Sequence, residues 1–135
     1  HSVMHTGTAK AWHIHQVQVD WWYVFCGILK VALYDKREES PTQGELMEFL
    51  MGDHQPPKVV KIPPGVAHGC RCLQGPANLF YVTSKVYDPD DEGRIAFEQN
   101  TVDDRVFNHS NHEIRTGLFK ARIREQACCE QSFQR

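Results

Sequence analysis

Apolar and polar residues alternate in short runs along most of the first 86 positions of the chain. The runs cover residues 11–17, 21–26, 28–34, 44–51, 58–62, 68–73 and 77–86. Side chains on a β-strand point alternately to opposite faces, so each run can bury one face and expose the other. Residues that favour turns separate the runs. The pattern therefore predicts an antiparallel all-β sandwich or barrel.

Glycine and proline residues mark the turns of this predicted barrel. Gly27 separates two apolar runs, and we expect a tight hairpin there. Polar loops are predicted at residues 38–44 and 52–57. The Pro-Pro-Gly sequence at residues 63–65 predicts a sharp turn just before His68.

The pattern changes after residue 86. Residues 87–93 are predicted to form an acidic turn, and we interpret residues 90–92 within it as solvated. Residues 118–127 are predicted to form a short helix. A chain of 135 residues is long enough for one well-buried core. We therefore expect one domain over residues 1–135, with its core at about 9–100 and a C-terminal extension at 101–135.

Charge and cysteine content narrow the classes of partner. The chain has 15 Lys and Arg against 17 Asp and Glu, a formal net charge of −2, and no long run of like charge. Neither nucleic acid nor a membrane is an expected partner. The five cysteines form no even disulfide framework and no CxxC pair, which favours reduced thiols and a cytoplasmic location. They are Cys26, Cys70, Cys72, Cys128 and Cys129.

Candidate chemistry is concentrated in three histidines and one acid. His13 and His15 are two residues apart on a predicted strand, so their imidazoles share a face. Asp20 follows soon after, and His68 can reach the same face from a distant strand. Such a cluster can bind a metal ion, or it can supply a general base to a pocket. The residues alone leave both interpretations open.

The spacing of these residues resembles the two signature motifs of the cupin superfamily. The first motif runs from Gly7 through the two histidines and Asp20 to Gly27, and the second is the Pro-Gly turn before His68. The resemblance implies a cupin double-stranded β-helix (jelly-roll) barrel. In a metal-dependent cupin, the divalent ion (Zn, Fe, Mn or Ni) would be held by His13, His15, Asp20 and His68, although metal-binding cupins mostly have Glu where Asp20 stands.

A closer resemblance covers about residues 9–100. Five segments follow one another in the order seen in the dTDP-4-dehydrorhamnose 3,5-epimerase family, a branch of the cupins. They are Lys10-Ala-Trp-His13 and residues 40–44, 62–69, 80–81 and 87–92. The resemblance implies an epimerase or isomerase that acts on, or binds, a nucleotide-linked 4-keto sugar. It also implies a homodimer and a reaction that needs no cofactor.

The same resemblance assigns roles by position. His13 falls on the catalytic base, which removes a proton beside the keto group, and Tyr81 falls on the tyrosine that returns one. Imidazole titrates near neutrality and phenol is a weak acid, so both residue types fit these roles. Substrate-binding roles fall on Lys10, at the position of a phosphate-binding arginine, and on His68 and Tyr87, and we expect Gln18 to reach the pocket.

Two departures from the family pattern bear on activity. Asp20 stands where the family has a lysine that stabilises the enolate, and a carboxylate there opposes the developing negative charge. The family's C-terminal aspartate, which orients the histidine base, has no counterpart that we can place after Gly93. These departures predict weak or absent turnover of the standard substrate. They also keep a third interpretation open, a cupin that binds a sugar without converting it.

Overall fold

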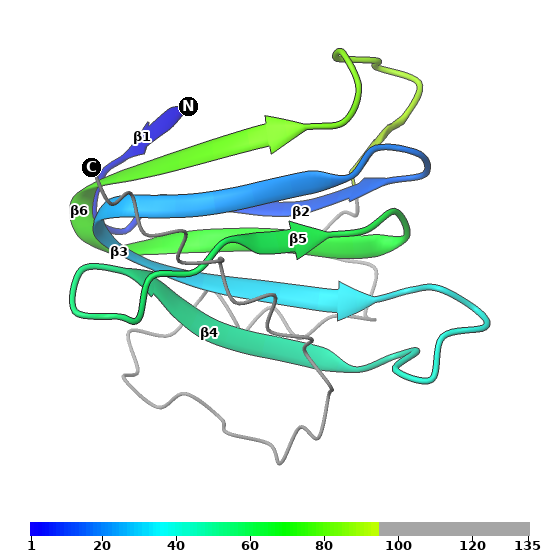
Figure 1. Cartoon of the computed structure of the whole chain (residues 1–135), viewed down its shortest axis with the longest axis horizontal. Coiled ribbons are helices and arrows are strands. Elements are labelled where there is room, and N and C mark those ends of the chain that lie inside the picture. The colour runs from blue at the N-terminus through cyan, green and yellow to red at the C-terminus, as the bar shows by residue number, and fades with distance from the viewer. Residues whose placement is uncertain (95–135) are drawn as a thin grey trace, which may run out of the picture.

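Seven β-strands and no helix make up residues 1–94, the part of the chain that the computed structural model describes (Figure 1). The predicted helix at 118–127 and the extension at 101–135 lie outside the described residues. Within residues 1–94, no helix has the length and apolarity needed to cross a membrane. The strands are β1 (Ser2–Met4), β2 (Ala9–His15), β3 (Asp20–Asp35), β4 (Leu46–Gly52), β5 (Val60–Ile62), β6 (Val66–Thr83) and β7 (Glu92–Arg94).

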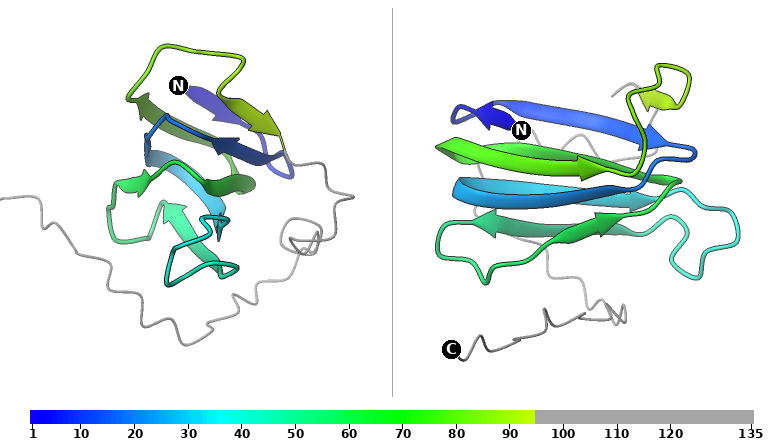
Figure 2. Two further views of the ribbon diagram at one scale, coloured as in Figure 1. Left: turned by 90° about the vertical axis from the view of Figure 1, so that its right-hand side faces the viewer. Right: turned by 45° about the horizontal axis from the view of Figure 1, so that its top comes forward.

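Two long strands, β3 and β6, organise the fold. They pair antiparallel along nearly their whole length, from Asp20↔Thr83 to Asp35↔Val66, and both fold over midway (Figure 1). One half of this pair lies in a layer of order β4-β3-β6-β2-β7. The other half is flanked by β1, which pairs with β6, and by β5, which pairs with β3. The result is a two-layered, all-β structure, as the alternating pattern predicted (Figure 2).

Gly27 does not form the predicted hairpin. β3 continues through it, and the residues on either side pair with β6 instead of with one another. Gly27 has φ +75°, and a Cβ atom at this position would lie 2.5 Å from the Cα of Ala77. The register of β3 against β6 also shifts between Val24 and Leu29. Gly27 therefore allows a sharp bend that carries one strand from the first layer to the second.

The core lies between the two layers. β1, β5 and the first half of β3 contribute Met4, Ile62 and Trp22, while the second half of β3 contributes Leu29 and Val31. Cys70 and Cys72 face this core from β6, and burial raises the pKa of the Cys70 thiol to about 12. Both are small core residues, and the three cysteines within residues 1–94 are free thiols.

Candidate active site

Three histidines converge inside the sandwich, at the end where β2 finishes and β3 begins. His13 on β2 pairs directly with His68 on β6, and their ring centroids lie 6.2 Å apart at 24°. His15 lies on the other side of His68, at 5.7 Å and 29°. Trp22 packs edge-on against His68 at 5.2 Å. The imidazoles thus form a row with His68 at its centre, in keeping with the two-residue spacing of His13 and His15.

His68 is the buried member of the row. Only 2% of the residue is exposed, and its Nδ1 lies 3.1 Å from the carbonyl oxygen of Val66. A carbonyl oxygen can only accept a hydrogen bond, so Nδ1 carries the proton and Nε2 keeps a lone pair. Burial lowers the pKa of His68 to about 4. The ring is therefore neutral at pH 7, and its unprotonated Nε2 lies 3.7 Å from Oδ2 of Asp20.

Asp20 lies beside the row, buried at the start of β3. Its Oδ1 accepts a hydrogen bond from Nε2 of Gln18 at 2.7 Å. Its Oδ2 lies 3.7 Å from Nε2 of His68 and 4.0 Å from Nε2 of His15. The Gln18 amide nitrogen also lies 3.3 Å from Nε2 of His15. Gln18 therefore belongs to the buried polar cluster.

Two neighbouring acids of the segment 87–93 also reach the site, so the prediction of a solvated turn is wrong for them. Glu92, on β7, places Oε1 3.0 Å from Nδ1 of His13. Asp91 accepts hydrogen bonds from the backbone N–H groups of residues 16–18 at 2.8–3.0 Å. Burial raises the pKa of Asp91, but these bonds outweigh it and hold the pKa below its usual value. Composition could not reveal either contact, because acids in a turn look alike whether solvated or bonded.

The other predicted site residues are more exposed than the histidines of the row. Tyr81 pairs with Trp22 across β6 and β3, so both side chains lie on the inner side of the sheet, and Tyr81 is 42% exposed. Lys10 is exposed on β2, where its Nζ donates to the hydroxyl of Ser2 at 2.6 Å. Tyr87 is 76% exposed on the loop between β6 and β7. The structure therefore does not place Lys10 or Tyr87 in contact with the histidine row.

Three of the four predicted metal ligands come together. One ligand atom each from His15, Asp20 and His68 lies within 4.8 Å of the other two, whereas His13 is not part of this group. Two imidazole nitrogens and a carboxylate oxygen suit Zn, Fe, Mn or Ni, which bind such atoms at about 2 Å. Nε2 of His68 is the nitrogen left free for such a bond, because Nδ1 faces the carbonyl of Val66. The three residues therefore fit a divalent cation in ligand type, and their ligand atoms would have to move closer together to bind one.

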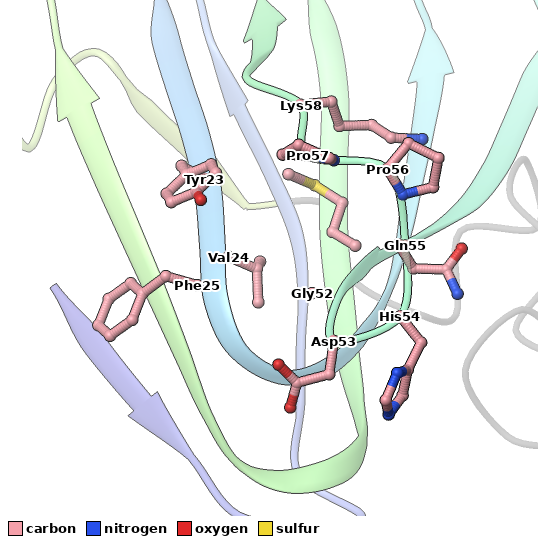
Figure 3. A pocket seen from close by; sticks show the side chains of 11 residues that line it. Tyr23, Val24, Phe25, Gly52, Asp53, His54, Gln55, Pro56, Pro57 and Lys58 are labelled. Atoms are coloured by element: carbon pink, nitrogen blue, oxygen red, sulfur yellow. The ribbon is translucent and has the colours of Figure 1, made fainter.

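A separate hollow of about 230 Å³ lies near the bend of β3, at the other end of the sandwich (Figure 3). Its wall includes Tyr23, Asp53 and Lys58, and Asp53 accepts a hydrogen bond from the backbone N–H of Gly27 at 2.9 Å. None of the predicted site residues lines this hollow. Asp53 therefore supports the bend of β3 rather than the histidine site.

Comparison with known proteins identifies the family. The family model of dTDP-4-dehydrorhamnose 3,5-epimerase matches residues 1–114. The chain belongs to this family. It is 41% identical over 104 residues to the spore coat polysaccharide biosynthesis protein SpsL of Bacillus subtilis, covering 75% of this chain and 68% of SpsL. It is 36% identical over 102 residues to a probable low-salt glycan biosynthesis epimerase, Agl13, of Haloferax volcanii, covering 73% of this chain and 65% of Agl13.

Solved structures of the same family share the fold. A dTDP sugar isomerase from Desulfovibrio desulfuricans superposes with a TM-score of 0.69 at 26% identity, over 76% of this chain and 66% of the isomerase. A 3,5-epimerase from Legionella pneumophila, in complex with dTDP-4-keto-L-rhamnose, gives 0.65 at 25%, over 74% and 54% of the two chains. The predicted all-β, cupin-like barrel is confirmed. The chain spans about half to two-thirds of the length of these relatives.

Proposed function

We propose that the protein is an epimerase or isomerase of a nucleotide-linked 4-keto sugar, with His13 as the catalytic base. The observation that carries this proposal is the accessibility of His13. Its side chain is 30% exposed, against 14% for His15 and 3% for His68. Its Nδ1 is occupied by Glu92, so its Nε2 is the nitrogen that remains for a substrate. Family membership supplies the class of reaction.

In the proposed reaction, Nε2 of His13 removes a proton from a carbon next to the keto group. The electrons of that C–H bond form a C=C bond, and the carbonyl π electrons move to oxygen, giving an enolate. Tyr81 then donates its phenolic proton to the opposite face of the same carbon. The His13 imidazolium releases its proton to solvent, and solvent reprotonates the tyrosine. This sequence requires only a base and an acid, so we propose that it proceeds without a cofactor. Lys10 and Tyr87 are proposed to contact the substrate outside the row.

Asp20 is expected to limit this reaction. It is a buried carboxylate close to the row, at the position where the family has a lysine that stabilises the enolate. A negative charge there raises the energy of a developing oxyanion. We therefore propose that turnover of dTDP-4-keto-6-deoxyglucose is weak or absent, and that binding of some nucleotide sugar is retained.

The test is proton–deuterium exchange at the carbons that flank the ketone, followed by NMR in D₂O. Wild type should exchange at least one of these protons, and His13→Asn should lose about 10²- to 10⁴-fold in rate, the range typical of a general base. Tyr81→Phe should slow epimerisation more than exchange, because the enolate still forms. His54→Asn, at an exposed position in the loop that follows β4, is the matched control. Exchange that is unchanged in His13→Asn contradicts the assignment of the base.

A second candidate function is a metal-dependent cupin reaction, and the convergence of His15, Asp20 and His68 is the observation that favours it. A cation held there would supply positive charge to stabilise an enolate, as the family's lysine does. Elemental analysis of protein purified without added metal tests this candidate. His15→Ala should lose the metal while Tyr81→Phe keeps it. An absence of stoichiometric metal in the wild type, before and after incubation with Zn²⁺ or Mn²⁺, would remove this candidate.

The third candidate, a cupin that binds a sugar without turning it over, is separated by the same experiments. A nucleotide sugar that binds in calorimetry, without exchange at any carbon and without bound metal, would favour this candidate over both enzymatic ones. Loss of calorimetric binding in Tyr81→Ala would then place the ligand at the histidine row. Binding that is unchanged in Tyr81→Ala would place it elsewhere.

We also propose a homodimer, formed through the outer face of the layer that contains β1 and the paired halves of β3 and β6. Tyr23 and Phe80 pair on this face, and Phe25 and Val82 lie two residues farther along their strands. Exposed fractions of 36–55% leave this apolar surface uncovered in one chain. A second copy suits such a face because the face can pair with itself. Phe80→Lys should give a monomer in light scattering, whereas Val86→Lys, on a loop, should not.

We propose a cytoplasmic location, which the free thiols of Cys26, Cys70 and Cys72 support. Two of these thiols are buried in the core, where a reducing compartment would keep them unpaired. Fractionation of the native host with detection by antibody tests the location. Recovery of the protein in the membrane or extracellular fraction would contradict it.

A further inference from the structure

We propose that Glu92 is the positioning residue of His13: it fixes the orientation and the tautomer of the imidazole so that Nε2 is available as the base. The catalytic consequence of this inference rests on the proposed function. The contact between Glu92 and His13 does not, because it is part of the structure of residues 1–94. The segment that contains Glu92 was predicted to be a solvated turn. The assignment of an orienting role to Glu92 therefore comes from the structure.

The carboxylate of Glu92 contacts the imidazole of His13 directly. Oε1 of Glu92 lies 3.0 Å from Nδ1 of His13, and the Glu92 side chain is 16% exposed. β7 pairs with β2 in the register His15↔Glu92 and His13↔Arg94, so Glu92 reaches His13 diagonally on one face of the sheet. Arg94, directly opposite His13, is 78% exposed and its Nη2 lies 3.7 Å from the same carboxylate oxygen. The carboxylate is thus held between an imidazole and a guanidinium group.

The contact with Glu92 determines which nitrogen of the His13 ring carries the proton. An ionised carboxylate has only acceptor sites, so a hydrogen bond from Nδ1 places the imidazole proton on that nitrogen. The lone pair of the neutral ring then lies on Nε2. A base needs a lone pair aimed at the substrate proton, and holding the wrong tautomer greatly reduces catalysis in histidine-dependent enzymes. Glu92 therefore acts through His13 and needs no contact with the substrate.

Hydrogen bonds to residues 16–19 hold the segment that contains Glu92. Its neighbour Asp91 binds three backbone N–H groups of residues 16–18, in the turn between β2 and β3. At the other end of the same segment, the backbone N–H of Ser84 donates to the carbonyl of Val19, and Val19 N–H donates to the Ser84 hydroxyl, both at 2.9 Å. The segment from Ser84 to Glu92 is therefore tied at both ends to the turn that follows the two histidines. Asp91 fixes the backbone, and Glu92 fixes the imidazole.

The experiment compares Glu92→Gln and Glu92→Ala with Asp90→Asn. The control removes a carboxylate from the same segment, at an exposed residue whose side chain makes no contact with a histidine among the described residues. The first readout is the tautomer of His13, from long-range ¹H–¹⁵N NMR correlations of the ring. Wild type and Asp90→Asn should show the proton on Nδ1. Glu92→Ala should show a mixture of tautomers or a predominant Nε2–H form.

The second readout is kinetic. Both Glu92 variants should lower kcat for exchange by roughly 10- to 10³-fold, with KM within about twofold of wild type, because the carboxylate does not touch the substrate. Circular dichroism melting checks that each variant is folded. A KM that rises while kcat is unchanged, or an Nδ1–H tautomer that persists fully in Glu92→Ala, overturns the proposal.

The two proposals fail in different ways. If wild type exchanges no proton but Glu92→Ala alters the His13 tautomer, the proposed function is wrong and the positioning role stands. If wild type exchanges protons and neither the tautomer nor kcat responds to Glu92, the positioning role is wrong and the proposed function stands.

Discussion

Replacing Gln18 by Met should destabilise the protein by removing the hydrogen-bond donor of a buried carboxylate. Gln18 is 8% exposed, and within residues 1–94 its amide makes the one hydrogen bond to the Asp20 side chain, at 2.7 Å. Met has a similar length and shape, so packing changes little while the donor is lost. A hydrogen bond to a buried charged group contributes about 1.5–3 kcal/mol. The free energy of unfolding should fall by about this amount, and Tm by roughly 6–12 °C.

Gln16→Met is the matched control for this substitution. Gln16 lies two residues earlier and is exposed, and its contact with Asp91 uses the backbone N–H, which the substitution retains. Its unfolding free energy should stay within about 0.5 kcal/mol of wild type, as is usual for surface substitutions. Urea unfolding in the presence of EDTA measures both variants and excludes stabilisation by a bound cation.

A double-mutant cycle with Asp20→Asn isolates the interaction. If the loss in Gln18→Met comes from the unpaired Asp20 carboxylate, the same substitution should cost less in the Asp20→Asn background, with a coupling free energy of about 0.5–3 kcal/mol. Equal losses in the two backgrounds would refute the reasoning. So would a Gln18→Met variant as stable as Gln16→Met.

Two further predictions concern the scaffold. The hydrogen bond from Arg37, assisted by two hydroxyl groups, holds the pKa of Asp35 well below its usual range, so the stabilisation that Asp35 provides is present above about pH 4 and is lost as pH falls through the lowered pKa. The difference in urea stability between wild type and Asp35→Asn should therefore be about 1–3 kcal/mol at pH 6 and shrink toward pH 2. A difference that does not change with pH would contradict this prediction. Gly27→Ala should lower the unfolding free energy by about 2–5 kcal/mol, because φ is +75° and the new methyl group would overlap Ala77. Gly44→Ala, with φ +78° and open space around it, should lose only about 1–2 kcal/mol, and equal losses would show that the close approach at the bend is unimportant.

The sequence predicted those parts of the site that depend on local geometry. The two-residue spacing of His13 and His15 fixes their common face on any strand, and the Pro-Pro-Gly turn fixes the start of the strand that contains His68. Both relations follow from neighbouring residues. Register across the sheet then placed His13 opposite His68 without any further requirement.

The features that the sequence could not supply depend on distant contacts. Glu92 lies 79 residues from His13, and Asp91 lies 73–75 residues from the backbone groups that it binds. Neither pairing leaves a periodic signal in the chain. At Gly27, a glycine between apolar runs fits a hairpin or a bend equally well, and only the continuous pairing of β3 with β6 decides between them.

The site contains two carboxylates that serve different parts of it. Glu92 contacts His13, the accessible imidazole, whereas Asp20 lies among His15, His68 and Gln18 in the buried part of the cluster. The proposed proton abstraction at His13 and the proposed cation binding at the buried cluster therefore use different atoms and do not exclude one another. Variants can separate them, because Glu92→Gln changes the accessible pair alone and His15→Ala changes the buried group alone. If metal binding and exchange are both lost in His15→Ala while Glu92→Gln keeps its metal, the buried cation supports catalysis at His13. It would then supply the positive charge that a lysine provides at the position of Asp20 in the family.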